Sequence, residues 1–97
     1  MNPPDPRSTA LLLMDVINDF EFEGSGDLMR HALPAAAEIA RLKRGMREAG
    51  IPAIYVNDNF GRWQSDFREQ ISRCLERSCP GHPFVNQLEP DREDFLF

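Results

Sequence analysis

The 97-residue chain lacks any apolar run near the roughly 20 residues that a membrane-spanning helix needs. Its first eight residues, MNPPDPRS, are polar and rich in proline, and they contain no apolar stretch of the kind found in secretory signals. The sequence therefore predicts no membrane helix, and we expect a cytoplasmic location.

Positive charge is also in short supply. The chain has 11 Lys and Arg against 16 Asp and Glu, a net charge of -5, whereas binding to nucleic-acid phosphates requires clustered cations. We therefore expect no nucleic-acid partner. One basic cluster is present, formed by Arg41, Lys43, Arg44 and Arg47. Glu38 and Glu48 flank it at the spacing of helical ion pairs, so we interpret it as a solvated helix face.

Cysteine is scarce, and the two that are present, Cys74 and Cys79, lie five positions apart. This spacing matches neither the usual pair of zinc ligands nor the CxxC redox motif. A structural disulfide is not expected in a reducing compartment. The sequence therefore predicts two free thiols, either buried or at the surface.

The composition is that of a soluble globular protein, with 41% hydrophobic and 28% charged residues. A chain of this length forms at most one domain with one core.

Three segments have the pattern of strands. Residues 10–14 within TALLLMDVINDF are continuously apolar, which is typical of a strand buried on both faces of a parallel sheet. A helix fragment has the same local pattern, but the short run and its polar ending favour a strand. IPAIYVND predicts a second strand with Pro52 near its start, and EDFLF predicts the beginning of a third.

Helices are predicted between these strands. A mobile loop is predicted at residues 24–26. The first helix should then cover residues 34–49, with Pro34 in its first turn and Gly50 as its left-handed C-terminal cap. Its apolar face consists of Ala35, Ile39, Leu42 and Met46. A second helix should follow Ser65 as its cap and end at CPGHP, with residues 84–90 irregular.

This alternation of strands and helices predicts an open parallel α/β sheet. Ligands bind outside the carboxyl ends of the strands in such sheets, and both Asp15 and Asp58 directly follow a predicted strand. Asp15 is therefore a candidate catalytic residue. The alternative is that its carboxylate caps the next turn, as Asn18 and Asp19 also can.

The segments LLLMDVINDF, AGIPAIYVNDNFGRW and PFVNQLEP, in this order, resemble the isochorismatase-like family of cysteine hydrolases over nearly the whole chain. The resemblance implies a three-layer α/β/α fold with a six-stranded parallel sheet of Rossmann-like topology, which is incomplete in this chain. It also implies an Asp-Lys-Cys catalytic triad.

The resemblance assigns roles to three residues, Asp15, Phe20 and Trp63. Asp15 matches the aspartate that takes the thiol proton before the thiolate attacks an amide-like carbonyl. Phe20 matches an aromatic residue of the substrate pocket, although a core position is the common alternative for phenylalanine. Trp63 and Asn57 are further candidates for substrate contact, and Asn57 could instead shape its loop.

General chemistry agrees with the roles of an aspartate as the base and a cysteine thiol as the nucleophile. A thiol with a pKa near 8.5 is a poor nucleophile until a base or a cation favours the thiolate. A carboxylate that is partly withdrawn from water becomes a better base, and Asp15 follows an apolar strand.

Two members of the triad have no counterpart in the 97 residues. The family's lysine follows the third strand, where this chain reaches Phe97, and Lys43 lies in the first predicted helix. Neither Cys74 nor Cys79 matches the family's nucleophile. We therefore expect residues 1–97 to be the N-terminal half of a single hydrolase domain that is inactive by itself and leaves the first strand exposed along one edge. The alternative is a catalytically dead α/β fragment that acts as an interaction or oligomerisation module.

The resemblance also bears on cofactors and partners. The nicotinamidase branch holds a metal ion with histidines after the second strand, where this chain reads Asp58, Asn59 and Phe60. No metal or other cofactor is therefore expected, and His31 and His82 are interpreted as structural or solvent-facing. The expected partners are a small-molecule substrate and other copies of the protein in a homo-oligomer. The chemistry could be that of an amidase or that of a true isochorismatase, which cleaves a vinyl ether without the cysteine.

Overall fold

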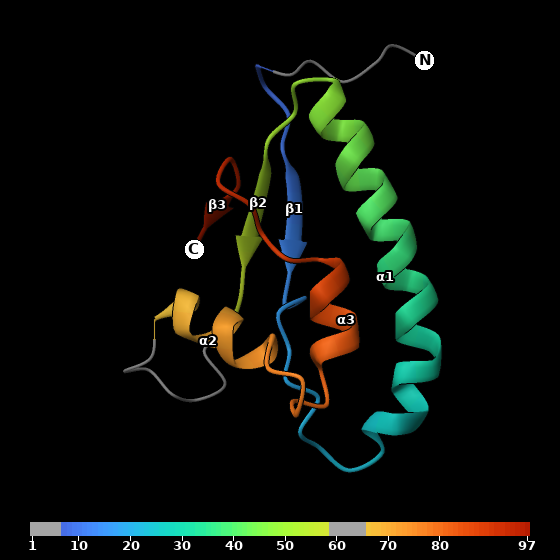
Figure 1. The fold of residues 1–97 in the computed structure, drawn as a ribbon. Coiled ribbons are helices and arrows are strands. Elements are labelled where there is room, and N and C mark those ends of the chain that lie inside the picture. The colour runs from blue at the N-terminus through green and yellow to red at the C-terminus, as the bar shows by residue number, and fades with distance from the viewer. Residues whose placement is uncertain (1–6, 59–65) are drawn as a thin grey trace.

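The computed structural model describes residues 7–58 and 66–97, and in them a parallel sheet of order β1-β2-β3 is packed against helices (Figure 1). The strands are β1 (Leu11–Met14), β2 (Ala53–Val56) and β3 (Phe95–Leu96), and the helices are α1 (Ser25–Glu48), α2 (Phe67–Cys74) and α3 (His82–Gln87). Leu12 pairs with Ile54, and Ile54 pairs with Phe95. The predicted α/β class with a parallel sheet is confirmed.

Helix α1 begins nine residues earlier than the sequence predicted. Gly24 adopts a left-handed conformation with φ 84° immediately before Ser25, so the predicted loop is largely the first turn of the helix. The prediction that Pro34 starts the helix was wrong, because Pro34 lies inside it. Pro34 is exposed, on a side of the helix where water can replace the hydrogen bond that proline removes.

The end of α1 was predicted correctly. Gly50 has φ 80° and its N–H donates to the Arg47 carbonyl, while the Ile51 N–H donates to the Met46 carbonyl. These two bonds form a Schellman cap, which requires the left-handed residue that glycine supplies. The helix therefore stops there and the chain enters β2.

The second helical region differs from the prediction. Asp66 caps α2 by accepting the Glu69 N–H at 2.8 Å, whereas the predicted cap, Ser65, lies outside the described residues. The segment 84–90, which was predicted to be irregular, includes most of α3, which buries Val85 and is followed by buried Leu88. Six residues are too few for a helical pattern to stand out in the sequence.

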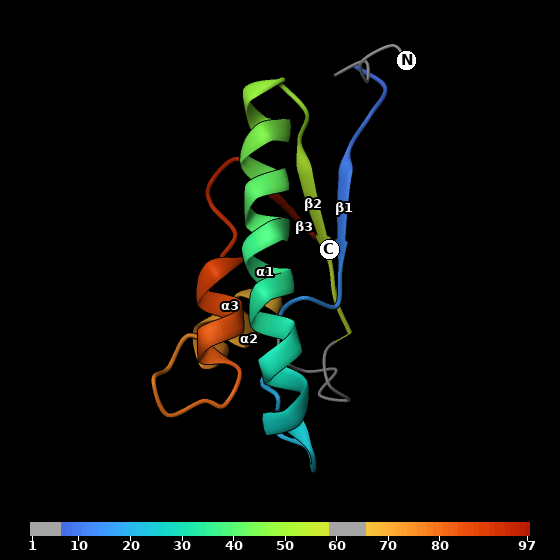
Figure 2. The same ribbon diagram turned by 90° about the vertical axis from the view of Figure 1, so that its right-hand side faces the viewer.

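All described helices lie on one face of the sheet, as Figure 2 shows with α1, α2 and α3 on one side of the strands. This follows from right-handed crossovers that step in one direction from β1 to β3. Leu13 faces the helices and is 5% exposed, whereas Leu12 and Met14 face the other way and are 52% and 61% exposed. The prediction that the first strand is buried on both faces is thus not met by the described residues.

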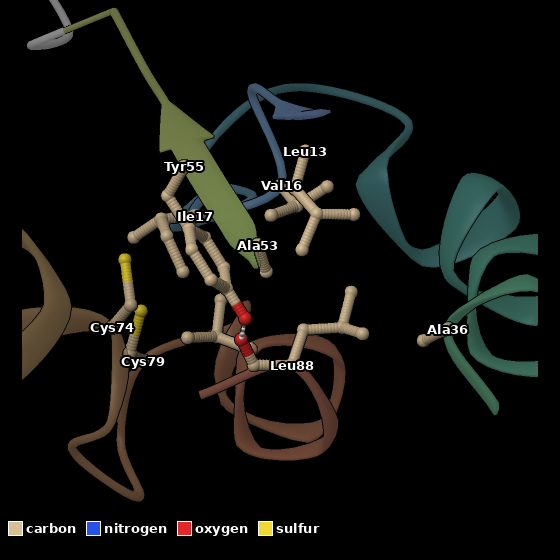
Figure 3. Packing of buried hydrophobic residues seen from close by; sticks show 10 residues of the cluster. Leu13, Val16, Ile17, Ala36, Ala53, Tyr55, Cys74, Cys79 and Leu88 are labelled. Carbon is tan, nitrogen blue, oxygen red and sulfur yellow. Dashed lines mark hydrogen bonds between the residues drawn. The ribbon is translucent and has the colours of Figure 1, made fainter. Parts of the chain in front are cut away.

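The core lies between the sheet and the helices (Figure 3). Its largest fully buried side chains are those of Tyr55, Ile17, Leu88, Val85 and Cys74. The Tyr55 hydroxyl donates a 2.7 Å hydrogen bond to the Leu88 carbonyl, which ties β2 to the end of α3. No helix within residues 7–58 or 66–97 combines the length and apolar character that crossing a membrane requires.

Candidate active site at the strand ends

Asp15 lies directly after β1 and is joined to the end of β2 by two hydrogen bonds. Its N–H donates to the Val56 carbonyl at 2.8 Å, and its Oδ1 accepts the Asp58 N–H at 3.1 Å. Asp15 has φ 57°, a left-handed conformation that is uncommon for a residue with a side chain. Such conformations persist where the surroundings enforce them, and they concentrate at functional sites.

Asn57 occupies the matching position after β2. Its Oδ1 accepts the Ile17 N–H at 3.1 Å, and its Nδ2 donates to the carbonyls of Ile17 and Asp58, both at 2.9 Å. Its own N–H donates to the Phe97 carbonyl at 3.4 Å. Asn57 therefore connects the carboxyl ends of all three described strands.

The loop after Asp15 is held by turns of its own. Asn18 Oδ1 accepts the Phe20 N–H at 2.7 Å, and Asp19 Oδ1 accepts the Glu21 N–H at 3.0 Å. These are Asx turns, as the sequence allowed. The Asp15 carboxylate behaves differently, because the N–H that it accepts comes from the segment that follows β2 and not from the turn that follows Asp15 itself.

The candidate residue Phe20 is placed less favourably for ligand contact than Asp15 or Asn57. Phe20 is 4% exposed and packs against Phe84 and Phe22, with ring centroids at 5.3 and 5.8 Å. Its ring thus serves the packing of the loop. Trp63 lies outside the described residues. The structure therefore brings Asp15 and Asn57 together at one edge of the sheet and places Phe20 in the interior.

The expected withdrawal of Asp15 from water is not provided by the described residues. Asp15 is exposed, and the neighbouring Met14 side chain is 61% exposed. Met14 is exposed because the described helices cover only the opposite face of the sheet (Figure 2).

Both cysteines are free and buried, as one of the two predicted placements had it. Burial raises the pKa of the Cys74 thiol to about 12, so the thiolate is nearly absent at neutral pH. The Cys79 thiol lies 3.5 Å from the Asp19 carbonyl and donates to it. The environment of Cys74 therefore does not activate a nucleophile, in agreement with the absence of a sequence match.

Sequence reasoning missed a charged cluster under α1. The interpretation of Lys43 as part of a solvated face was wrong, because its side chain is 11% exposed and its Nζ contacts Asp94 Oδ2 at 2.5 Å and the Tyr55 hydroxyl at 3.0 Å. Burial lowers the pKa of Lys43, but the hydrogen bonds to Asp94 and Tyr55 outweigh it and raise the pKa above its usual value. A signal was available, since Lys43 lies four residues after Ile39 on the apolar side of the helix.

This cluster of Lys43, Arg47 and Asp94 lies at the amino ends of the strands, opposite the carboxyl ends where Asp15 lies. Asp94 directly precedes β3, whereas Asp15 directly follows β1, and the strands are parallel. Arg47 also contacts Asp94, at 3.1 Å. The cluster therefore stabilises the sheet and takes no part in the candidate site.

Comparison with known proteins agrees with this architecture. The model of the isochorismatase domain matches residues 9–97. An uncharacterized isochorismatase family protein, YaaI of Bacillus subtilis (strain 168), is 39% identical over 88 residues, which cover 90% of this chain and 47% of that protein. The chain thus spans about half the length of the curated relative that it matches. No solved structure matches the chain.

The domain match includes β1, β2 and β3 and both strand-end residues, Asp15 and Asn57. It covers nearly every residue that the structure describes. The chain belongs to the isochorismatase family.

Proposed function

We propose that residues 1–97 form the N-terminal half of a hydrolase domain in which Asp15 is the general base. The observation that carries this proposal is the geometry of Asp15. Its backbone has φ 57°, and the N–H of Asp58 holds one carboxylate oxygen at the carboxyl edge of the sheet. An open α/β sheet binds its ligands at that edge.

In the proposed reaction, Asp15 takes the proton of a cysteine thiol, and the thiolate attacks the carbonyl carbon of a small amide-like substrate. A lysine stabilises the negative charge that develops on the carbonyl oxygen. Only the aspartate lies within these residues, since Lys43 is bonded to Asp94 and burial raises the pKa of Cys74 to about 12. Residues 1–97 alone are therefore proposed to be inactive, with the lysine and the cysteine supplied by further sequence.

The proposed substrate lies beside Asp15, with Trp63 as its aromatic contact. Phe20 holds the loop in place through Phe22 and Phe84, because its ring is 4% exposed. The proposed enzyme is a cytoplasmic homo-oligomer that uses no cofactor. Cleavage of a vinyl ether without a cysteine is the alternative chemistry for the same edge of the sheet.

A second candidate function is that of an interaction or oligomerisation module without catalysis. The uncovered face of the sheet favours it, because Leu12, Met14 and Phe95 are each more than half exposed there. In the described residues, β1 pairs only with β2, so one edge of β1 is open to another strand.

The two candidates are separated by the isosteric substitution Asp15→Asn, tested with small amides in the intact protein and in residues 1–97 alone. We expect the intact protein to lose about 10²- to 10⁴-fold in kcat/KM, since the base is removed without a change of shape. Asp19→Asn is the matched control, because Asp19 lies in the same loop and only closes a turn. Full activity of the Asp15→Asn variant would rule out the proposed role. Turnover by residues 1–97 alone that disappears in that variant would contradict their inactivity.

A further inference from the structure

We propose that Asn57 is a positioning residue for Asp15 and not a substrate contact. It holds the strand ends together so that one carboxylate oxygen of Asp15 is fixed and the other is free to accept a proton. This inference rests on the proposed function, in which Asp15 is the base.

The Asn57 carboxamide uses both of its N–H donors within the protein. A carboxamide has two N–H donors and one acceptor oxygen. Nδ2 donates to the Ile17 and Asp58 carbonyls, and Oδ1 accepts the Ile17 N–H. Both donors are thus used within the protein, and a substrate carbonyl finds no free N–H on this side chain.

The hydrogen bonds of Asn57 replace backbone pairing between the ends of β1 and β2. At Asp15 the positive φ turns the chain out of the sheet, so the regular ladder between β1 and β2 ends with the bond from the Asp15 N–H to the Val56 carbonyl. Ile17 lies two residues after Asp15 and has a fully buried side chain. Its N–H and its carbonyl both pair with the Asn57 side chain. The carboxamide therefore continues the pairing of the strands where the backbone cannot.

The hydrogen bonds of Asn57 reach the Asp15 carboxylate through Asp58. Asp58 follows Asn57, its carbonyl accepts from Asn57 Nδ2, and its N–H donates to Asp15 Oδ1. Asn57 thus fixes the residue that orients Asp15. Among the described residues, no hydrogen bond occupies Asp15 Oδ2. The geometry assigns Oδ2 as the proton acceptor and Oδ1 as the anchored oxygen.

The test compares Asn57→Ala with Asn86→Ala in the intact protein, since Asn86 is an exposed asparagine of α3. Loss of the Asn57 side-chain hydrogen bonds should lower kcat about ten- to a hundredfold per folded molecule, because small displacements of a catalytic group reduce the rate by such factors. KM should change less than threefold, and Asn86→Ala should match the wild type. A large rise in KM with kcat retained would show substrate contact and overturn the proposal. So would an unchanged kcat in folded Asn57→Ala.

A charge-introducing variant tests whether the side chain at position 57 lies close to the proposed base. Asn57→Asp keeps the acceptor for the Ile17 N–H and places a second carboxylate beside the strand ends. A like charge disfavours ionisation of a neighbouring carboxyl group, so the acid limb of the kcat/KM profile should move to higher pH. An acid limb at the wild-type position would contradict the proposal.

One measurement requires no variant at Asn57. The pH dependence of the Asp58 amide resonance should differ between the wild-type protein and Asp15→Asn, because only the wild-type protein has a carboxylate that accepts the Asp58 N–H. Identical pH dependences, which would reflect Asp58's own carboxyl group alone, would overturn the proposal even if Asn57→Ala fails to fold. If Asp15→Asn keeps full activity, the proposed function fails by itself. If Asp15→Asn is inactive and Asn57→Ala changes only KM, the positioning role alone fails.

Discussion

Lys43 Nζ and Asp94 Oδ2 lie 2.5 Å apart, although 51 positions separate the two residues in the chain. Their side chains are 11% and 2% exposed, so this is a buried ion pair. It joins the C-terminal part of α1 to the residue before β3, a strand of only two residues. The pair therefore holds the third strand against the rest of the sheet.

Replacement of Lys43 by methionine should reduce the free energy of unfolding by about 3 kcal/mol, because it leaves the buried Asp94 carboxylate with only Arg47 and the Asp91 N–H as partners among the described residues. Urea unfolding measures this change. The double variant Lys43→Met/Asp94→Asn should recover part of the stability, since the uncompensated charge is removed with its partner. A loss below about 0.5 kcal/mol in the single variant would show that the pair is solvated like a surface ion pair.

Gly81 should not tolerate alanine. A Cβ atom at Gly81 would lie 2.0 Å from the Asn18 carbonyl oxygen, so the start of α3 would have to move away from the loop that follows β1. We expect a loss of about 2 kcal/mol in thermal or urea unfolding. Gly45→Ala is the matched control, because no atom lies within 4 Å of its Cβ and its place inside α1 favours alanine by up to about 1 kcal/mol. Equal stabilities of the two variants would contradict the close approach.

The buried thiol of Cys74 should resist alkylation in the folded protein. A pKa raised from 9.0 to about 12 reduces its thiolate fraction at pH 8 about a thousandfold. Mass spectrometry after iodoacetamide treatment of residues 1–97 with Cys79→Ser, in which Cys74 is the remaining thiol, should show rapid modification only in denaturant. A rate in the folded protein equal to that of a small thiol would contradict this environment.

The same pKa shift predicts a loss of stability in alkali. The folded state favours the neutral thiol, so the stabilisation is fully present below pH 9 and is lost as the pH rises from 9.0 towards about 12. In Cys74→Ala, this contribution to the slope of stability against pH should disappear. An unchanged slope would show that Cys74 titrates alike in the folded and unfolded states.

The strands, the α/β class and the glycine cap of α1 could be predicted from local sequence, because short apolar runs and Gly50 act through their immediate neighbours. The start of α1 could not, since the usual rule for proline assigned Pro34 to a first turn. Lys43 was misplaced because its partner, Asp94, is remote in sequence. For the site, the sequence indicated Asp15 through its position after a strand and gave Asn57 as a candidate substrate contact. It could not show that the Asn57 amide is used by Ile17 and Asp58, which depends on the register of two strands.

The uncovered face of the sheet should drive association of residues 1–97. Leu12, Ile54 and Phe95 form a row across the three strands by their register, and Leu12 and Phe95 are 52% and 54% exposed. An apolar face of this kind lowers its free energy by leaving water. Sedimentation velocity should therefore detect species larger than the 11.1 kDa monomer.

Leu12→Lys should shift this equilibrium towards the monomer by about tenfold in dissociation constant, because one buried leucine contributes about 1.5 kcal/mol or more to such contacts. Leu42→Lys is the matched control, since Leu42 is 48% exposed but lies on α1. If both variants weaken association equally, the contact is spread over the surface. If Leu12→Lys associates like the wild type, another part of the chain forms the contact. Selective loss in Leu12→Lys assigns the contact to the face that the described helices leave uncovered, and that face would then be where a partner chain or further sequence completes the domain.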